Sequence, residues 1–189
     1  MVSQFIKPGT NVLELGGSLG IVSASIRRAI GPHAFHLIVE ANTALLDICR
    51  SNASIGAQPG TVEVINAAID YSGKAKVRFC SSPDALGGHL ASQSESGQPV
   101  KATTFRELAD RMPSKPFALV CDIEGAEFEL FQHDVDALSD VSLVIVEMHP
   151  TRHCDGPRAV ERTVAALEDA GFKRMSAEDN VLTFSRAAL

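Results

Sequence analysis

The sequence predicts an α/β fold in which helices cover both faces of a doubly wound, mostly parallel sheet. Two observations carry this prediction. Short apolar runs rich in Val, Ile and Leu alternate with amphipathic stretches of about ten or more residues, the pattern of successive βαβ units. Near the C-terminus, residues 172–175 and 181–185 flank a polar turn and predict a closing antiparallel hairpin. A chain of 189 residues has the length of one domain, and we expect residues 1–189 to form a single one.

The first half of the chain predicts three parallel strands separated by two helices. Gly31 and Pro32 end the first helix in the usual order. Asn42 or Thr43 caps the second helix, whose apolar positions fall on one face. The strands are expected at 11–15, 35–39 and 62–66, and the helices at 21–30 and from the cap to about residue 54.

The middle of the chain departs from this alternation. Residues 74–80 alternate basic with small or apolar side chains, which predicts a half-exposed antiparallel strand. Residues 81–99 are rich in Ser, Gly and Gln and predict a long mobile loop within the domain. We expect residues 100–103 to pair with the exposed strand. Thr104 then caps a helix over 105–112, and Glu107 completes a capping box.

Regular alternation resumes in the last third of the chain. The continuous apolar run 117–122 predicts a central parallel strand that is buried on both faces. Together with the hairpin, the parallel strands make a sheet of seven. The remaining elements are expected as a short helix at 125–131, a strand at 141–148, a helix at 158–170, and hairpin strands at 172–175 and 181–185.

Composition excludes several other classes of protein. With 45% hydrophobic residues and a formal net charge of −6, the chain is neither disordered nor a disulfide scaffold. No apolar run approaches a membrane span, and the first residues lack a secretory signal. The four cysteines lie far apart without a C-x-x-C pair, which favours reduced thiols. Without a membrane span or a secretory signal, we expect a cytoplasmic protein that binds no membrane. Acidic residues are in excess and Lys and Arg are not clustered, so we expect no binding to nucleic acid. A homodimer stays open.

The candidate site follows from the topology, because ligands of an open parallel sheet bind beyond the carboxyl ends of its strands. The turn at 16–20 fails the dinucleotide fingerprint, since Ser18 stands where the second essential glycine belongs, and no phosphate-loop lysine follows. Gly16 and Gly20 are expected to let a nucleoside with an amino-acid tail approach the backbone. Glu40, ending the second strand, would accept both ribose hydroxyls, and Glu14 would attract a cationic amino group. Such a pocket suits a positively charged nucleoside better than a phosphorylated one.

These motifs also resemble a known family. Residues 12–20, Val-Leu-Glu-Leu-Gly-Gly-Ser-Leu-Gly, resemble the first motif of class I S-adenosylmethionine-dependent methyltransferases, and residues 39–42 resemble the acidic end of their second strand. Residues 66–69, 72–75, 100–108 and 121–127, the last reading Cys-Asp-Ile-Glu-Gly-Ala-Glu, together resemble the FkbM family. The resemblance implies a Rossmann-like sheet of seven strands, S-adenosyl-L-methionine as methyl donor, and O-methylation of a hydroxyl on a sugar or natural-product small molecule.

Two departures from the family pattern stand out. Ala41 replaces the proline that is common after the strand-two acid, which should affect rigidity more than binding. The first motif begins about a dozen residues into the chain, so we expect the amino-terminal segments that often cover the acceptor site to be missing or removed.

The predicted cofactor-binding residues lie at four strand ends. Asn66 and Ala67 are expected to line the adenine, because a small side chain leaves room for the ring, and Asp122 to border the methionine part. The predicted cofactor-binding residues are Glu14, Gly16, Gly17, Ser18, Gly20, Glu40, Ala41, Asn66, Ala67 and Asp122.

The predicted catalytic residues are His149, Asp122 and Glu124. A hydroxyl acceptor needs a base, and His149 is assigned that role, with Asp122 or Glu124 as substitutes. Helix stabilisation alone would explain Glu127, and contact with the acceptor stays open. Asp122, Glu147 and His149 could together ligate a divalent metal, but their spacing is not peculiar to metals and we predict none. Two alternatives stay open: a non-catalytic adenosylmethionine-binding module and an NAD(P)-dependent oxidoreductase.

Overall fold

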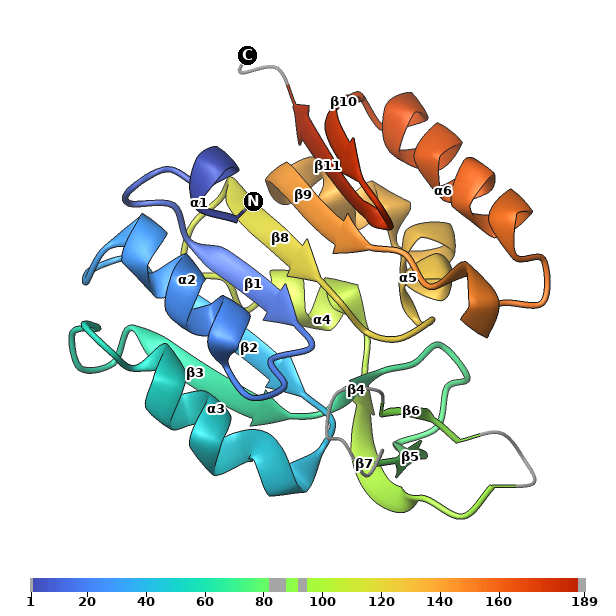
Figure 1. The fold of residues 1–189 in the computed structure, drawn as a ribbon, viewed down its shortest axis with the longest axis horizontal. Coiled ribbons are helices and arrows are strands. Elements are labelled where there is room, and N and C mark those ends of the chain that lie inside the picture. Colours follow the sequence, from blue (N-terminus) through green and yellow to red (C-terminus); the bar gives the residue numbers. More distant parts are fainter. Residues whose placement is uncertain (1, 82–87, 92–94, 187–189) are drawn as a thin grey trace.

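A computed structural model describes residues 2–81, 88–91 and 95–186. Its main sheet has seven strands in the order β10-β11-β9-β8-β1-β2-β3 (Figure 1). The pairs from β9 through β8, β1 and β2 to β3 are parallel, and β10 and β11 form an antiparallel hairpin against β9. The predicted α/β fold is therefore confirmed. The strands are β1 Val12–Leu15, β2 His36–Glu40, β3 Val62–Asn66, β8 Phe117–Cys121, β9 Val141–Glu147, β10 Phe172–Glu178 and β11 Val181–Arg186.

Helices cover both faces of this sheet (Figure 1). Every residue of β8 is buried, as its continuous apolar run predicts for a central strand between two helical layers. Helices α1 to α3 pack on one face and α4 to α6 on the other. The helices are α1 Val2–Phe5, α2 Ile21–Ile30, α3 Leu46–Ala53, α4 Phe105–Ala109, α5 Glu127–His133 and α6 Pro157–Asp169, with short 3-10 turns η1 Thr43–Leu45, η2 Val135–Asp140 and η3 Pro150–Arg152.

A second, smaller sheet lies beside the carboxyl ends of the parallel strands (Figure 1). Its order is β4-β7-β5-β6, formed by Ala68–Ile69, Gln98–Thr103, Lys76–Cys80 and His89–Leu90. The predicted antiparallel pairing of β5 with β7 is present. Strands β4 and β6 were not predicted, because two residues are too few to establish a period. Strand β6 falls inside the range 81–99 predicted as a mobile loop; within that range, residues 82–87 and 92–94 lie outside the described residues.

The ends of two helices, α4 and α5, differ from the predicted ones. Thr104 accepts a hydrogen bond from the backbone N–H of Glu107, and the predicted capping box is present, but α4 ends at Ala109 rather than at residue 112. Helix α5 begins at Glu127, two residues later than predicted. The delay follows from the backbone before it, since Glu124 and Gly125 both have positive φ and cannot continue a right-handed helix.

In the part of the chain that the structure describes, no helix combines the length and the apolar character needed to cross a membrane.

Candidate functional site

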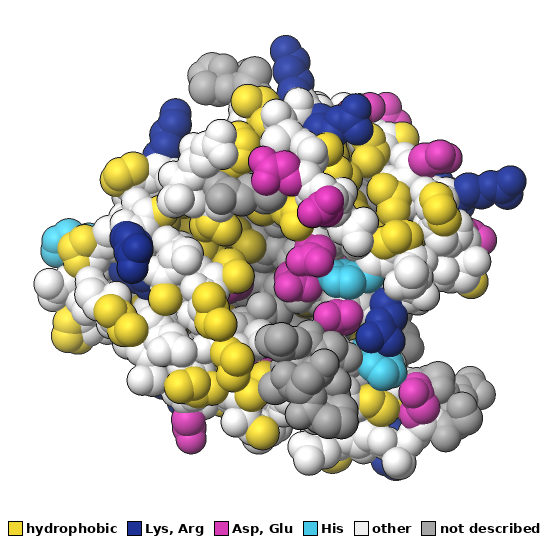
Figure 2. Space-filling model, viewed as in Figure 1, with side chains coloured by type: hydrophobic (Ala, Val, Ile, Leu, Met, Phe, Trp, Pro, Cys, Tyr) yellow, Lys and Arg dark blue, Asp and Glu magenta, His cyan; other side chains and the backbone are white. Residues whose placement is uncertain are grey.

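A cavity of about 430 Å³ lies at the carboxyl ends of β1, β2, β8 and β9. This is the edge of the sheet at which a parallel α/β fold binds its ligands, and the volume is that of a small-molecule site. The small sheet supplies the facing wall. On the surface, acidic side chains gather around a histidine at the edge of a hollow (Figure 2). Lining residues include Gly16, Gly17, Ser18, Ile21, Val22, Glu40, Ala41, Ala67, Phe79, Gly88, Leu90, Asp122, Ile123, Glu124, Glu147 and His149.

The glycines of the β1–α2 turn are required by the protein's own packing. A Cβ on Gly16, which has φ +89°, would lie 1.8 Å from the backbone oxygen of Asp122. A Cβ on Gly17 would lie 2.6 Å from Ile38, and one on Gly20 would lie 2.8 Å from the backbone oxygen of Cys49. Packing alone therefore explains these glycines, because the turn must fit between β8 and α3. That Gly16 and Gly20 let a ligand approach the backbone stays a prediction. Gly20 does not line the cavity.

Glu40 is the centre of a backbone network at the end of β2. One carboxylate oxygen accepts a hydrogen bond from the N–H of Ser18 and the other from the N–H of Asn42, each at 2.6 Å. Burial raises the pKa of Glu40, and the hydrogen bonds from Asn42 and Ser18 oppose that rise. The side chain thus ties the β1–α2 turn to the loop after β2 while it lines the cavity.

Asn66 supports the same strand end from β3. Its Nδ2 donates to the backbone oxygens of Glu40 and Ala41, at 2.9 and 3.0 Å, and its Oδ1 accepts from the hydroxyl of Thr43 at 3.1 Å. Asn66 does not itself line the cavity, whereas its neighbour Ala67 does. The amide therefore holds the loop after β2 in place.

Glu14 lies behind the cavity rather than in its lining. The side chain is 1% exposed, and Oε2 is 2.9 Å from Nε2 of His36, which is 0% exposed, on the neighbouring strand. The two side chains share one face of the sheet, because the register pairs Glu14 with Ile38 and places His36 two residues earlier. The structure thus brings Glu14 to an internal histidine, and a contact with a cationic amino group stays a prediction.

The end of β8 carries two of the predicted catalytic residues into the cavity. Asp122 follows the strand directly, and Glu124 stands in a left-handed conformation with φ 53° before Gly125. A Cβ on Gly125 would lie 2.8 Å from Cβ of Arg152, so this turn is packed against η3. Burial and the nearby charge of Glu147 raise the pKa of Asp122 to about 6. Asp122 does not cap α5, whose N-cap is Ala126.

His149 follows β9 and is held by Glu127. Oε1 of Glu127 accepts the backbone N–H of His149 at 2.7 Å and lies 3.2 Å from its Nδ1. Oε2 accepts the backbone N–H of Gly125 at 2.8 Å. Glu127 is 0% exposed, so one buried carboxylate fixes both the β8 turn and the histidine.

The other ring nitrogen of His149 faces a ring of carboxylates. Nε2 lies 3.6 Å from Asp122, 3.8 Å from Glu124 and 3.9 Å from Glu147. Burial lowers the pKa of His149, but the hydrogen bond and charge of Glu127 and the charges of Glu124 and Asp122 outweigh it, so the pKa is raised. The site thus favours the protonated imidazole and can accept a proton at Nε2.

Ligand atoms from Asp122, Glu124 and His149 lie within 4.8 Å of one another, a spacing that a cation could bridge. The sequence groups Glu147 with Asp122 and His149 instead. In the structure, Oε1 of Glu147 lies 3.9 Å from Nε2 of His149, but Glu147 is not one of the three residues whose ligand atoms meet this spacing.

The sequence predicts most of the residues that line the cavity at the strand ends, but not those of the small sheet that forms the facing wall. Phe79, Gly88 and Leu90 come from the small sheet and line the cavity. They lie in a stretch without a motif, and no signal in the sequence places them opposite β1. The sequence does not decide between helix stabilisation and acceptor contact for Glu127. Its hydrogen-bond partners, Gly125 and His149, belong to different segments, and no local pattern shows that they meet.

Comparison with solved structures shows which proteins share this fold. Precorrin-6y C5,15-methyltransferase from Geobacter metallireducens GS-15 matches with a TM-score of 0.57 and 13% identity, over 98% of this chain and 84% of that one. TrmK of M. capricolum, solved with its natural cofactor product S-adenosyl-homocysteine, matches with a TM-score of 0.52 and 9% identity, over 98% and 66%. The fold is that of the S-adenosylmethionine-dependent methyltransferases.

The profile of the methyltransferase FkbM domain matches residues 18–174, and the chain belongs to this family. The predicted family and its cofactor class are confirmed. Among curated proteins, a carboxy-S-adenosyl-L-methionine synthase of Enterobacter sp. (strain 638) is 33% identical over 70 residues. That match spans 36% of this chain and 28% of the relative.

Proposed function

We propose that the chain transfers a methyl group from S-adenosylmethionine to a hydroxyl group of a small molecule, a sugar or a natural product. The observation that carries the proposal is the continuity of one cavity from Glu40, at the end of β2, to His149, after β9. A carboxylate suited to ribose hydroxyls and an imidazole suited to accept a proton thus border the same space.

The donor end of the cavity fits an S-adenosyl nucleoside. Each oxygen of Glu40 accepts one backbone N–H and keeps lone-pair capacity for a ribose hydroxyl. Beside it, the buried Oγ of Ser18 has no hydrogen-bond partner within the described residues and is available to a ligand. Ala67 leaves room for a flat ring. When bound, the donor supplies an electrophilic methyl group on its sulfonium.

The acceptor end is assigned to His149 as general base. With Nδ1–H directed at Glu127, the lone pair of the imidazole lies on Nε2, on the side of Asp122 and Glu124. Nε2 takes the proton of the attacking hydroxyl, and the surrounding carboxylates stabilise the imidazolium that forms. The chain otherwise contributes alignment of the acceptor oxygen with the methyl carbon.

The carboxylates at the cavity mouth favour a hydroxylated small molecule over a nucleic acid. Asp122, Glu124 and Glu147 can each accept hydrogen bonds from acceptor hydroxyls, whereas they would repel phosphates. The formal net charge of −6 acts in the same direction.

Tritium-labelled S-adenosylmethionine tests the proposal when offered with a panel of sugars and polyhydroxylated natural products, beside a tRNA transcript. We expect label in a base-stable ether of a small molecule. His149→Gln should lower kcat by about 100-fold to 10,000-fold, the usual contribution of a general base, without weakening S-adenosylhomocysteine binding. His33→Gln is the matched control: His33 is exposed, and its replacement should leave kcat unchanged.

Three outcomes would contradict the proposal. Label in the transcript alone would replace the acceptor class. Binding of S-adenosylhomocysteine with no transfer to any offered alcohol would support the non-catalytic binding module, and binding of NAD(H) in its place would support an oxidoreductase.

A further inference from the structure

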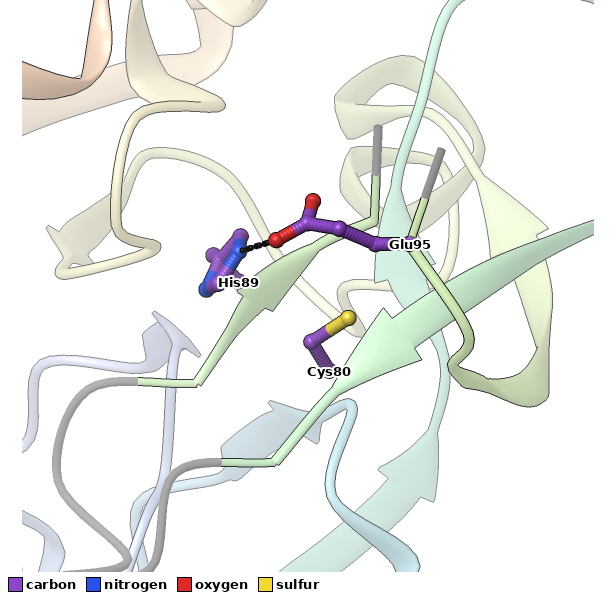
Figure 3. A group of neighbouring side chains, drawn as sticks. All are labelled: Cys80, His89 and Glu95. Atoms are coloured by element: carbon purple, nitrogen blue, oxygen red, sulfur yellow. Dashed lines mark hydrogen bonds and ion pairs between the residues drawn. The ribbon is translucent and has the colours of Figure 1, made fainter. Parts of the chain in front are cut away.

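A group of three side chains on the small sheet stands apart from the site described above. Cys80 ends β5, His89 begins β6, and Glu95 lies on the segment that leads into β7. Figure 3 shows the three side chains turned toward one another, and one ligand atom from each lies within 4.8 Å of the others. They offer a thiolate sulfur, an imidazole nitrogen and a carboxylate oxygen.

The strand register places this group on the face opposite the cavity. Strands β5 and β6 are antiparallel, with Phe79 opposite Leu90 and Cys80 opposite His89. Directly opposed residues share a face, and successive pairs alternate between faces. Phe79 and Leu90 line the cavity. Cys80 and His89 therefore point to the other side, and the group has no part in the cavity lining.

The spacing of the group matches that of metal ligands better than that of an ion pair. Nε2 of His89 lies 3.3 Å from Oε1 of Glu95, longer than a good charge-assisted hydrogen bond. Two ligands that each lie about 2.0–2.1 Å from a tetrahedral zinc ion are about 3.3 Å apart. The thiol of Cys80 donates a weak hydrogen bond of 3.5 Å to the backbone oxygen of Ser96, which zinc binding would replace.

The backbone on both sides is shaped for this approach. A Cβ on Gly88, next to His89, would lie 2.4 Å from the Phe79 ring. A Cβ on Gly97, two residues after Glu95, would lie 2.7 Å from the backbone oxygen of Phe79. Glycine at both positions lets the two segments close on the end of β5, where Cys80 stands. His89 and Glu95 keep 28% and 43% of their side-chain surface exposed, so an ion can enter from solvent.

We propose that Cys80, His89 and Glu95 bind one Zn²⁺, with the fourth position open to solvent. A borderline-soft cation without geometric demands of its own suits one sulfur, one nitrogen and one oxygen ligand. The ion ties β5, β6 and the start of β7 together and so fixes the wall that carries Phe79 and Leu90. Binding releases the thiol proton to solvent, because the thiolate is the ligand.

Zinc titration of the chelator-treated, reduced full chain tests this proposal, with a chromophoric chelator as competitor. We expect one equivalent of Zn²⁺ per chain. Co²⁺ in its place should give thiolate-to-cobalt charge-transfer absorption. Cys80→Ser should abolish that absorption. Both Cys80→Ser and His89→Gln should weaken zinc binding by at least about 100-fold, because loss of a residue that only hydrogen-bonds a metal ligand weakens binding by at most about that factor.

Cys154→Ser is the matched control, because Cys154 is an exposed free thiol that also stands beside a histidine and a carboxylate, His153 and Asp155. It should leave both the stoichiometry and the absorption unchanged. Glu95→Gln, a conservative change at an exposed position, should weaken binding without altering the circular dichroism of the apo chain. No bound zinc, zinc retained in Cys80→Ser, or zinc lost in Cys154→Ser would each overturn the proposal. These experiments measure zinc binding and not methyl transfer, so failure of this proposal and failure of the proposed function are distinguishable.

Discussion

Glu127 joins the turn after β8 to His149, which is 22 residues away in the sequence. Its oxygens accept the backbone N–H groups of Gly125 and His149, and Oε1 also faces the imidazole. From the sequence, a glutamate in the first turn of a helix is explained by the helix dipole alone. Its second role depends on the chain after β9 returning to the end of β8, which no local pattern specifies. We therefore interpret Glu127 as a positioning residue that acts through His149.

Glu127→Gln should shift the pH dependence of catalysis. The catalytic form of His149 is the neutral base, so kcat rises with pH through a pKa that lies above the usual 6.5. Removing the carboxylate charge that raises this pKa should move the rise in kcat to lower pH. Because an amide offers one acceptor where two backbone N–H groups need both oxygens, the variant should also lose about 1–3 kcal/mol of stability.

Steady-state pH profiles and urea denaturation measure both effects. Glu129→Gln, an exposed change on the same helix, is the control and should alter neither. If the profile of Glu127→Gln coincides with that of the native chain, Glu127 does not act through the imidazole.

The ionised form of Asp122 lowers the stability of the folded protein, and the protonated form does not. Its pKa in the folded protein is raised to about 6, mainly by burial and by Glu147, so the stability it contributes is complete below its unfolded pKa of 3.8 and is lost as the pH rises through about 6. Asp122→Asn should therefore be more stable than the native chain at pH 8. Since 49% of the side chain is exposed, solvent limits the gain to about 1 kcal/mol, or about 2–4 °C.

Thermal unfolding at pH 8 and pH 5 checks this sign. The gain should shrink at pH 5, where Asp122 is largely protonated in the folded chain. An equal gain at both values, or a loss at pH 8, would show that the charge of Asp122 is not what costs stability.

At the scale of elements, the long strands and helices follow from local patterns and the turns between them do not. Apolar runs predict the buried parallel strands β1, β2, β8 and β9, because burial between two helical layers requires such runs. The mostly exposed β10 is predicted by the polar turn of the hairpin instead. Strands β4 and β6 owe their existence to partners instead. Ala68 and Ile69 pair with the end of β7, and His89 and Leu90 with the end of β5, so tertiary context alone makes them strands.

A substitution in the β1–α2 turn tests whether packing against β8 requires the glycine at position 16. Gly16→Ala puts a Cβ 1.8 Å from the backbone oxygen of Asp122, whereas Gly171→Ala, at a similar φ of +88°, meets nothing within 4 Å. Gly171→Ala should cost only the strain of an alanine at positive φ, about 1–2 kcal/mol. Gly16→Ala should cost at least about 2 kcal/mol more, because β1 and β8 must separate.

Urea denaturation of the two variants measures the difference directly. Equal losses would mean that the turn relaxes without strain, and that the tight crossing of β1–α2 with Asp122 does not constrain the site.

At the scale of the whole molecule, the cavity is a product of segments far apart in the chain. The rule that ligands bind at the carboxyl ends of parallel strands predicts the turn after β1, Glu40, and the ends of β8 and β9 before any contact is known. The rule cannot supply the wall of Phe79 and Leu90, which depends on how the small sheet folds back. It also cannot tell a lining residue from one behind the lining, and so Glu14, Gly20 and Asn66 lie outside the cavity surface.

The central claim is that this cavity binds an S-adenosyl nucleoside through the carboxylate of Glu40. Isothermal titration with S-adenosylhomocysteine should give one site per chain, and Glu40→Ala should weaken it about 10-fold to 100-fold, or about 1.4–2.7 kcal/mol. Asp47→Asn, at a fully exposed carboxylate nearby, should bind as the native chain does. Unchanged affinity in Glu40→Ala, or heat from NAD(H) and none from S-adenosylhomocysteine, would contradict the claim.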